Sequence, residues 1–318
     1  MAEAELGNKD PNAIENFSAS IDRQELGELE GISAPWPLTN KFLGRLGPGE
    51  VTVFAGTEGA GKTWFIVELM AHAHDLGKKW AYMPLEGDMN SYMRRFLAHK
   101  ARDWSVNDTG RESAAAARDA MSKHGSWLND VRKRIYKNPR LPSGNAAFGD
   151  ISAVPDIPYT RMIDWVAKSA IVRDLVVIDP ITMLDFDIDE HGNKINTYEG
   201  QNDFIKRLVA TIAGKKCHVV IVLHYSKGTN NVQGGADCTR FAHNVIKLNI
   251  HDEIDSLVMT QSAYSDELIE MEVAHKRTFR ISKTRNGKGN KIDVAVELGP
   301  SGPKIDEIGV IAKRKKGR

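Results

Sequence analysis

One stretch, Gly56–Thr63, constrains the fold more than any other, because it fits the phosphate-loop pattern G-x-x-x-x-G-K-[ST] at every fixed position. Its flanks supply the context that the pattern requires. Val51–Ala55 is an apolar, β-branched run typical of a buried strand. Trp64–Leu76 has apolar residues at helical spacing, with Gly77 placed to end the helix. The order strand, glycine loop, helix therefore predicts a phosphate-binding loop rather than a glycine-rich turn with a solvated lysine.

The chemistry of such a loop predicts a site for ATP or another nucleoside triphosphate with Mg²⁺. Glycines let successive backbone N–H groups turn toward a phosphate, and the positive end of the following helix points at the same anion. Lys62 is expected to reach the β- and γ-phosphates, and the Thr63 hydroxyl to bind Mg²⁺. The residues expected to contact the nucleotide are Gly56, Thr57, Glu58, Gly59, Ala60, Gly61, Lys62, Thr63 and Trp64.

Length and composition set the class of protein. The 318 residues suit one large α/β domain, and a net charge of +1 restricts any DNA contact to a local patch. Two cysteines in a chain that starts without a leader argue against a disulfide framework or a four-cysteine zinc site. Because no apolar run approaches membrane-spanning length, we expect a cytoplasmic protein without a membrane partner.

Glu86 follows a second apolar run, Lys79–Leu85, which we expect to form the strand beside the phosphate-loop strand. A carboxylate at that strand tip would lie where bound ligands gather, and could activate the water that attacks the γ-phosphate. Alternatively, acidic residues here serve the turn, with Asp88 capping a helix over 90–100.

Two further strand ends carry candidate site residues. Leu175–Asp179 is an apolar run ending in aspartate, the second element of a phosphate-loop ATPase, in which Asp179 holds a Mg²⁺-bound water. Cys217–Leu223 is a buried strand leading into His224, which could sense the γ-phosphate or be an ordinary histidine at a strand end.

The rest of the central chain is less informative. The pattern predicts helices over 112–123, 159–170 and 201–213, a strand over 131–136, and mostly loop over 138–158.

Two segments are candidates for polymer or neighbour contacts. The loop after His224 is rich in glycine and amides that can grip a phosphodiester backbone, although a plain surface loop fits as well. Its candidate DNA-binding residues are Lys227, Asn230, Asn231, Gln233, Gly234 and Gly235. Residues 278–294 predict a β-hairpin on which Lys283 and Arg285, two apart, point to one face. Such cations can reach a neighbour's γ-phosphate, but alone they would suit a solvated hairpin.

The order of these motifs resembles the RecA-like hexameric replicative helicases, which include DnaB and the helicase half of phage primase-helicases. Leu85–Met89 is similar to the family's S-L-E-M segment, and His224 matches its γ-phosphate sensor position. Gln233–Ala236 is similar to the R-G-S-G segment of a DNA-binding loop. Ser282–Gly287 resembles the K-x-R-N-G hairpin, which generic phosphate-loop proteins lack.

The resemblance implies a RecA-like α/β ATPase core with a mostly parallel sheet, covering Pro35 to Leu298. It implies that Glu86 is the catalytic base and that Lys283 and Arg285 act in trans on a neighbour's nucleotide. The implied assembly is a homo-oligomeric ring, a hexamer, that translocates on single-stranded DNA and unwinds duplex, with primase or replisome proteins as partners.

Several features depart from the family. The short stretch before the phosphate loop leaves no primase domain or DnaB-type collar, and Gln233 and Gly235 replace the loop motif's arginine and serine. We expect an N-terminal segment over 1–34 that is either a floppy tail or an arm packed on a neighbouring subunit, a core over 35–300, and a disordered basic tail over 301–318. A recombination ATPase akin to RecA or RadA, and a regulatory phosphate-loop ATPase, remain alternative functions.

Overall fold

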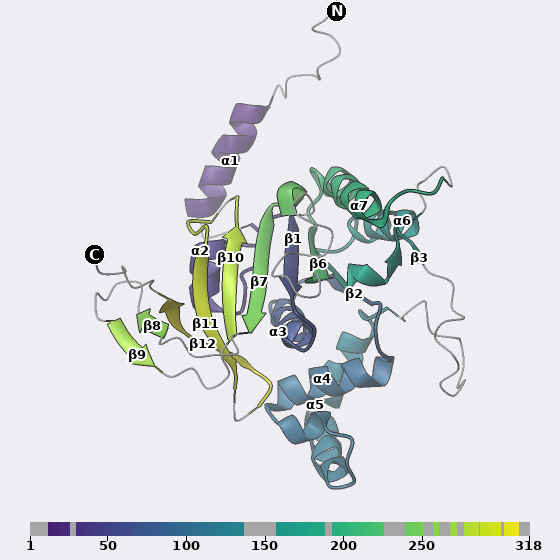
Figure 1. Ribbon diagram of the computed structural model, residues 1–318, viewed down its shortest axis with the longest axis vertical. Coiled ribbons are helices and arrows are strands. Elements are labelled where there is room, and N and C mark those ends of the chain that lie inside the picture. Colours follow the sequence, from purple (N-terminus) through teal and green to yellow (C-terminus); the bar gives the residue numbers. More distant parts are fainter. Residues whose placement is uncertain are drawn as a thin grey trace, which may run out of the picture.

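A single ten-stranded sheet organises the molecule (Figure 1). The computed structural model describes residues 12–25, 30–136, 157–187, 193–225, 239–250, 257–260, 268–271, 277–285, 287–299 and 302–311. The strand order is β2-β4-β6-β1-β7-β10-β11-β12-β8-β9.

Five parallel strands form one half of the sheet. They are β1 (Val51–Gly56), β2 (Trp80–Pro84), β4 (Leu175–Asp179), β6 (His218–His224) and β7 (Asn244–Ile250). Residues in β1, β2 and β4 are buried throughout, as expected for parallel strands covered by helices on both faces. This mostly parallel sheet confirms the predicted α/β class.

The other half of the sheet is antiparallel. It contains β10 (Arg277–Lys283), β11 (Ile292–Leu298), β12 (Ile305–Ile311), β8 (Leu257–Thr260) and β9 (Leu268–Met271). The pairing of β10 with β11 confirms the predicted hairpin. The expected tail over 301–318 is wrong for 305–311, because β12 pairs with β11 and β8 there; residues 312–318 lie outside the described part of the chain.

Helices cover the two faces of the parallel strands and enclose separate apolar clusters. One face carries α2 (Pro37–Leu43), α3 (Lys62–Asp75), α4 (Met89–Ala101), η1 (Trp104–Asn107) and α5 (Ser113–Arg132). The opposite face carries α6 (Tyr159–Ser169) and α7 (Thr197–Ile212), with η3 (Ile181–Met183) and the short strands β3 (Ile157–Pro158) and β5 (Leu184–Asp185) alongside. The predicted helix over 90–100 is confirmed as α4, and the Asp88 side chain accepts a hydrogen bond from Ser91 N as its cap.

Three sequence-based boundaries require correction. The strand expected over 131–136 is instead the end of α5, which buries Leu128 and Val131 at a spacing of three residues, followed by one bridge between Ile135 and Tyr82. The same helix runs nine residues beyond its expected end at Lys123. α7 begins four residues before its expected start, where the Asn196 side chain accepts a hydrogen bond from Tyr198 N.

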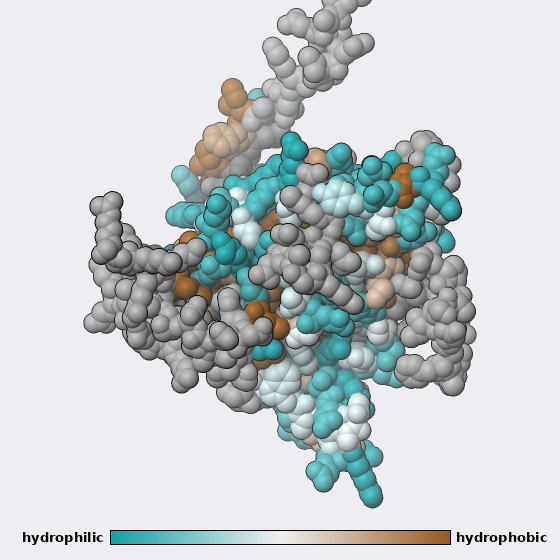
Figure 2. All heavy atoms as spheres, viewed as in Figure 1, coloured by the Kyte–Doolittle hydropathy of each residue, from teal (hydrophilic) through white to brown (hydrophobic). Residues whose placement is uncertain are grey.

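The helix α1 (Ala13–Glu25) extends away from the sheet (Figure 1). Its side chains Ile14, Phe17 and Ile21 are 83%, 67% and 40% exposed, and the space-filling view shows hydrophobic surface on this helix (Figure 2). Their spacing of three and four residues places them on one face of the helix. In the described part of the chain, no helix is long and apolar enough to cross a membrane.

Candidate active site

The phosphate loop connects β1 to α3 as its sequence predicts. Gly59 and Gly61 have φ angles of 75° and 95°, and Gly61 is the residue that precedes the first turn of α3. A Cβ atom on Gly56 would lie 2.8 Å from the carbonyl oxygen of Leu248, so the pairing of β1 with β7 requires glycine there. The loop therefore presents the N-terminus of α3 to the same edge of the sheet at which the parallel strands end.

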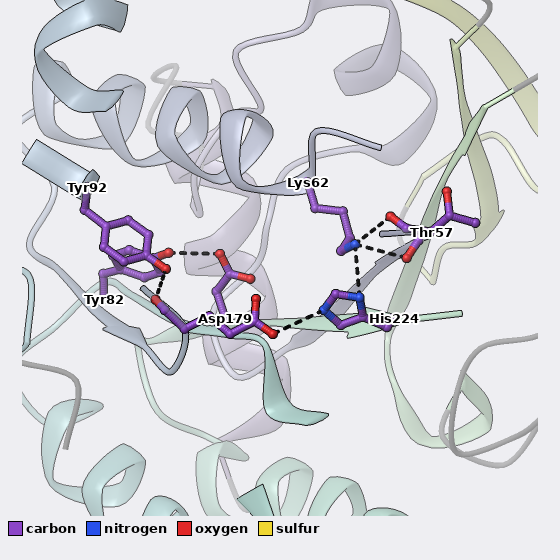
Figure 3. A network of polar contacts seen from close by, with 8 residues as sticks. Thr57, Lys62, Tyr82, Tyr92, Asp179 and His224 are labelled. Atoms are coloured by element: carbon purple, nitrogen blue, oxygen red, sulfur yellow. Dashed lines mark hydrogen bonds and ion pairs between the residues drawn. The ribbon is translucent and has the colours of Figure 1, made fainter. Parts of the chain in front are cut away.

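Lys62 lies at the centre of the site (Figure 3). Its side chain is 7% exposed, and its Nζ atom donates hydrogen bonds to the carbonyl oxygens of Gly56 at 3.1 Å and Thr57 at 2.8 Å. Burial lowers the pKa of this ammonium, whereas the carboxylates of Asp179, Glu86 and Glu58 raise it. A buried ammonium can bind a phosphate group. The three carboxylates nearby favour a phosphate that arrives together with a metal cation.

Oxygen ligands at this edge fit a nucleotide with Mg²⁺. The hydroxyl of Thr57 is buried without a hydrogen-bond partner among the described residues, which makes it a donor suited to a phosphate oxygen. Thr63 in the first turn of α3 and Asp179 at the end of β4 offer the hard oxygen atoms that Mg²⁺ prefers. Within the described residues no group of three His, Cys, Asp or Glu side chains could hold a metal. Thr63 and Asp179 supply two oxygen atoms, so phosphate and water would complete the coordination of the ion.

The remaining loop residues differ in exposure. Glu58 and Gly59 are exposed and Ala60 is buried. Trp64 is half-buried, with its ring edge-on to that of Trp104 and the two ring centroids 5.1 Å apart. The predicted contact between Trp64 and nucleotide stays a prediction.

Asp179 ends β4 with a side chain that is 4% exposed. Burial raises the pKa of this carboxyl to about 6, with Glu86 acting in the same direction and the Tyr82 hydroxyl and Lys62 opposing it. Tyr82 in β2 donates a 2.9 Å hydrogen bond to Asp179 Oδ2. No local motif marks Tyr82, because its role depends on the pairing of β2 with β4.

Glu86 and His224 approach each other across the site, with Glu86 Oε1 and His224 Nε2 3.9 Å apart. The expectation that the strand before Glu86 lies beside the phosphate-loop strand is wrong, because β4 and β6 stand between β2 and β1. The side chains still meet, since β2, β6 and β1 all end at one edge. Burial, and then the charge of Lys62, lower the pKa of His224. A neutral ring follows near pH 7, and its Nδ1 lies 3.5 Å from Lys62 Nζ.

The antiparallel half of the sheet contacts the phosphate loop, which the sequence did not predict. Arg277 in β10 donates from Nε to the carbonyl oxygen of Ala60 at 3.2 Å, and Leu298 lies beside Gly61. The antiparallel strands thus support the phosphate loop directly. Arg277 lies outside every recognisable motif, and 217 residues separate it from Ala60.

The hairpin cations lie at the opposite edge of the sheet. Lys283 ends β10, and its Nζ donates to the carbonyl oxygens of Arg240 and Ala242, both at 2.6 Å, and of Thr239 at 3.3 Å. Arg285 is exposed, whereas Lys283 is half-buried. The strict alternation expected of this strand is interrupted by a register shift between Ile281 and Lys283.

The predicted DNA-binding loop lies outside the described residues. Its residues are Lys227, Asn230, Asn231, Gln233, Gly234 and Gly235.

Comparison with known proteins gives both a family and a fold. A family model described as an AAA domain matches residues 28–230. A KaiC-like protein from the hyperthermophilic archaeon Pyrococcus horikoshii OT3 aligns with a TM-score of 0.53 at 16% identity, over 88% of this chain and 98% of that one. A DnaB-like replicative helicase, described with its interactions with primase, aligns with a TM-score of 0.58 at 10% identity.

That second match covers 91% of this chain and 65% of the helicase. A search of curated proteins finds no match. At these identities the likeness shows the fold, which is that of the RecA-like phosphate-loop ATPases.

Proposed function

The chain belongs to the AAA domain family. We propose that it is an ATP-driven DNA helicase that forms a ring and translocates on single-stranded DNA. The RecA-like fold and the phosphate loop support nucleotide hydrolysis. The narrower proposal of a DnaB-like replicative helicase, hexameric and working beside primase, rests on the motif order and on the hairpin with Lys283 and Arg285.

The position of Arg285 is the main observation that supports a ring of subunits. Lys283 lies opposite Val245 in β7, and its Nζ donates to the carbonyl oxygen of Ala242, next to His243; Arg285 follows two residues further along the chain. After burial, the charges of Arg285 and Lys283 lower the pKa of His243. His243 Nδ1 in turn accepts a hydrogen bond from Val51 N at 3.2 Å, at the first residue of β1. The phosphate loop leaves the other end of β1, at Gly56, about 16–17 Å away at about 3.3 Å per residue. This distance supports the proposal that Arg285 does not contact the nucleotide at its own loop and instead stabilises the γ-phosphate bound by a second copy.

A head-to-tail arrangement satisfies this requirement. Each interface would pair the phosphate loop of one subunit with the hairpin of the next, and such a heterologous contact closes into a ring when the rotation permits. The exposed stripe of Ile14, Phe17 and Ile21 supports the proposal that the arm expected over 1–34 packs on a neighbouring subunit through α1. The end of this segment packs on its own domain instead, because Ile32 is buried and pairs with Leu46.

The residues of the site have distinct roles in the proposed hydrolysis. Lys62 exchanges its two loop carbonyls for phosphate oxygens, and Glu86 orients the attacking water and accepts its proton. Mg²⁺, held through Thr63 and Asp179, would neutralise charge on the phosphates when bound. Arg285 of the next subunit would stabilise charge that builds up as the γ-phosphate departs.

His224 links hydrolysis to movement in this proposal. The imidazole of His224 lies between Lys62 and Glu86. In the sequence, His224 comes just before the candidate DNA-binding loop. A hydrogen bond to the γ-phosphate would be lost on phosphate release, and the loop could then pass the DNA backbone along.

Subunit mixing tests the shared site. We expect Lys62→Ala and Arg285→Ala to abolish ATPase activity separately and to recover part of it when mixed, because some interfaces then join an intact loop to an intact hairpin. Mixed assembly is verified by co-purification of differently tagged subunits. Mixed rings without any recovered activity would contradict action in trans.

DNA binding and unwinding test the narrower part of the proposal. Anisotropy of a labelled single-stranded oligonucleotide should show affinity that falls with salt, as backbone contacts require, and a forked duplex should unwind only with ATP. Open filaments on single-stranded DNA in electron micrographs would favour a recombination ATPase. ATP hydrolysis without DNA binding would favour the regulatory ATPase.

A further inference from the structure

Two tyrosines, Tyr82 and Tyr92, lie on the side of the candidate active site that is far from Thr57 (Figure 3). Tyr82 in β2 donates its hydroxyl proton to Asp179 Oδ2 at 2.9 Å, and Tyr92 in α4 donates to the carbonyl oxygen of Glu86. Their rings meet edge-on with centroids 5.3 Å apart. One aromatic pair therefore contacts both Asp179 and Glu86.

We propose that Tyr82 and Tyr92 are positioning residues, Tyr82 for the Mg²⁺-binding carboxylate of Asp179 and Tyr92 for the main chain of Glu86. This inference rests on the proposed nucleotide hydrolysis and does not depend on DNA unwinding.

The case for Tyr82 rests on burial and on the number of donors. Tyr82 is 0% exposed and Asp179 is 4% exposed, so water does not solvate this carboxylate freely. Among the described residues, the Tyr82 hydroxyl is the hydrogen-bond donor to the Asp179 side chain. A buried carboxylate held by one oxygen has a fixed rotamer, which leaves its second oxygen to accept a hydrogen bond from a Mg²⁺-bound water or to bind the ion.

The case for Tyr92 rests on the turn after β2. Gly87 has a φ of 71°, and a Cβ atom there would lie 3.6 Å from the Tyr92 ring. The ring thus packs on the turn while the hydroxyl holds the Glu86 carbonyl. The Glu86 side chain is 44% exposed, and the hydroxyl of Tyr92 acts on its main chain.

Phenylalanine substitutions separate these roles, because each removes one hydroxyl and keeps the ring. We expect Tyr82→Phe to raise the Mg²⁺ concentration for half-maximal ATPase activity about tenfold, the loss of one hydrogen bond to a charged group. Tyr92→Phe should lower kcat about tenfold and leave the Mg²⁺ requirement unchanged. Tyr159→Phe is the matched control, since Tyr159 is equally buried and donates at 2.8 Å to Asp203, on the opposite face of the sheet.

Binding provides a readout that does not depend on turnover. Anisotropy of a fluorescent ATP analogue should show that Tyr82→Phe loses about tenfold in affinity with Mg²⁺ and nothing with EDTA. The variant Tyr82→p-aminophenylalanine restores an N–H donor at the same place and should regain the wild-type Mg²⁺ dependence. This variant also guards against simple misfolding of Tyr82→Phe.

The outcomes discriminate clearly. A folded Tyr82→Phe protein with the wild-type Mg²⁺ requirement would overturn the role of Tyr82, as would an amino variant that binds Mg²⁺-nucleotide tenfold more weakly. A raised Mg²⁺ requirement in Tyr92→Phe would overturn the division between the two tyrosines, and an unchanged kcat would overturn the role of Tyr92. A wild-type protein that does not bind the analogue would instead contradict the proposed function itself.

Discussion

Glu68 offers a test of how the C-terminal strands are attached to the phosphate-loop helix. This residue of α3 is 5% exposed, and its Oε2 atom accepts a 2.8 Å hydrogen bond from Ile305 N at the start of β12. Burial raises the pKa of its carboxyl to about 7, although that hydrogen bond and the charges of Arg102 and Lys304 oppose the shift. The native state therefore holds this proton more tightly than the unfolded chain does.

The size and sign of the effect follow from linkage. In the unfolded chain the carboxyl ionises near its ordinary pKa of 4.5, whereas in the folded protein it ionises near 7. Its stabilising contribution is complete below pH 4.5 and is lost as pH rises through 7, at about 1.4 kcal/mol per pH unit. Between pH 5 and pH 8 the loss is about 2–3 kcal/mol. Glu68→Gln removes this titration and keeps an oxygen that can accept from Ile305 N.

Urea unfolding followed by tryptophan fluorescence measures the difference. We expect the free energy of unfolding of Glu68→Gln, relative to wild type, to rise by about 2–3 kcal/mol from pH 5 to pH 8. Other groups titrate in both proteins and cancel in this comparison. A Glu68→Gln protein whose stability follows the wild-type pH dependence would refute the assignment of a raised pKa to this carboxyl.

Two further predictions concern the support of the loop and the packing of a helix. Arg277→Ala should weaken nucleotide binding about five- to tenfold, because it removes a hydrogen bond to the phosphate loop. The control is Arg280→Ala on the same strand, which should not weaken binding because Arg280 pairs with Asp293 instead. Equal nucleotide affinities of the two variants in a fluorescence titration would contradict the support of the loop by Arg277. Gly200→Ala should destabilise the protein by about 1–3 kcal/mol, since its Cβ would lie 2.2 Å from the Phe186 carbonyl oxygen. Gly125→Ala in α5, whose Cβ would have no atom nearer than 3.6 Å, should stabilise the protein by about 0.5–1 kcal/mol. Chemical denaturation that ranks the stabilities of the two variants in the reverse order would contradict the packing argument.

The sequence predicted those parts of the site that depend on local patterns. An apolar run that ends in a polar residue marks a buried strand and its tip, so Asp179 and His224 could be placed at one edge of a sheet before the structure was known. The glycine pattern likewise located the phosphate loop and the start of α3. The strand order does not follow from such patterns, because it depends on which runs pair. The sequence therefore predicts β2 directly beside β1, whereas the structure has it three strands away.

Contacts between segments that are distant in the sequence could not be predicted, because they too depend on which strands pair. Tyr82 reads as an ordinary residue of a buried strand until β2 pairs with β4, and Arg277 reads as a surface cation until β10 reaches the loop. β12 was missed because its residues, I-D-E-I-G-V-I, alternate poorly and precede a basic run. In each case the informative neighbour lies far away in the sequence.

The structure also distinguishes the two hairpin cations, which the sequence treated as equivalent. The ammonium of Lys283 is held by the carbonyl oxygens of Thr239, Arg240 and Ala242, at the entrance to β7. Hydrogen bonds to a charged group contribute about 1.5–3 kcal/mol each, so moving this ammonium to a neighbour's phosphate would cost several kcal/mol before any gain. Arg285 is exposed, and its planar guanidinium can bind two phosphate oxygens at once. Within the proposed ring, Arg285 is therefore the residue that completes the neighbouring site, and Lys283 fixes the base of the hairpin from which it reaches.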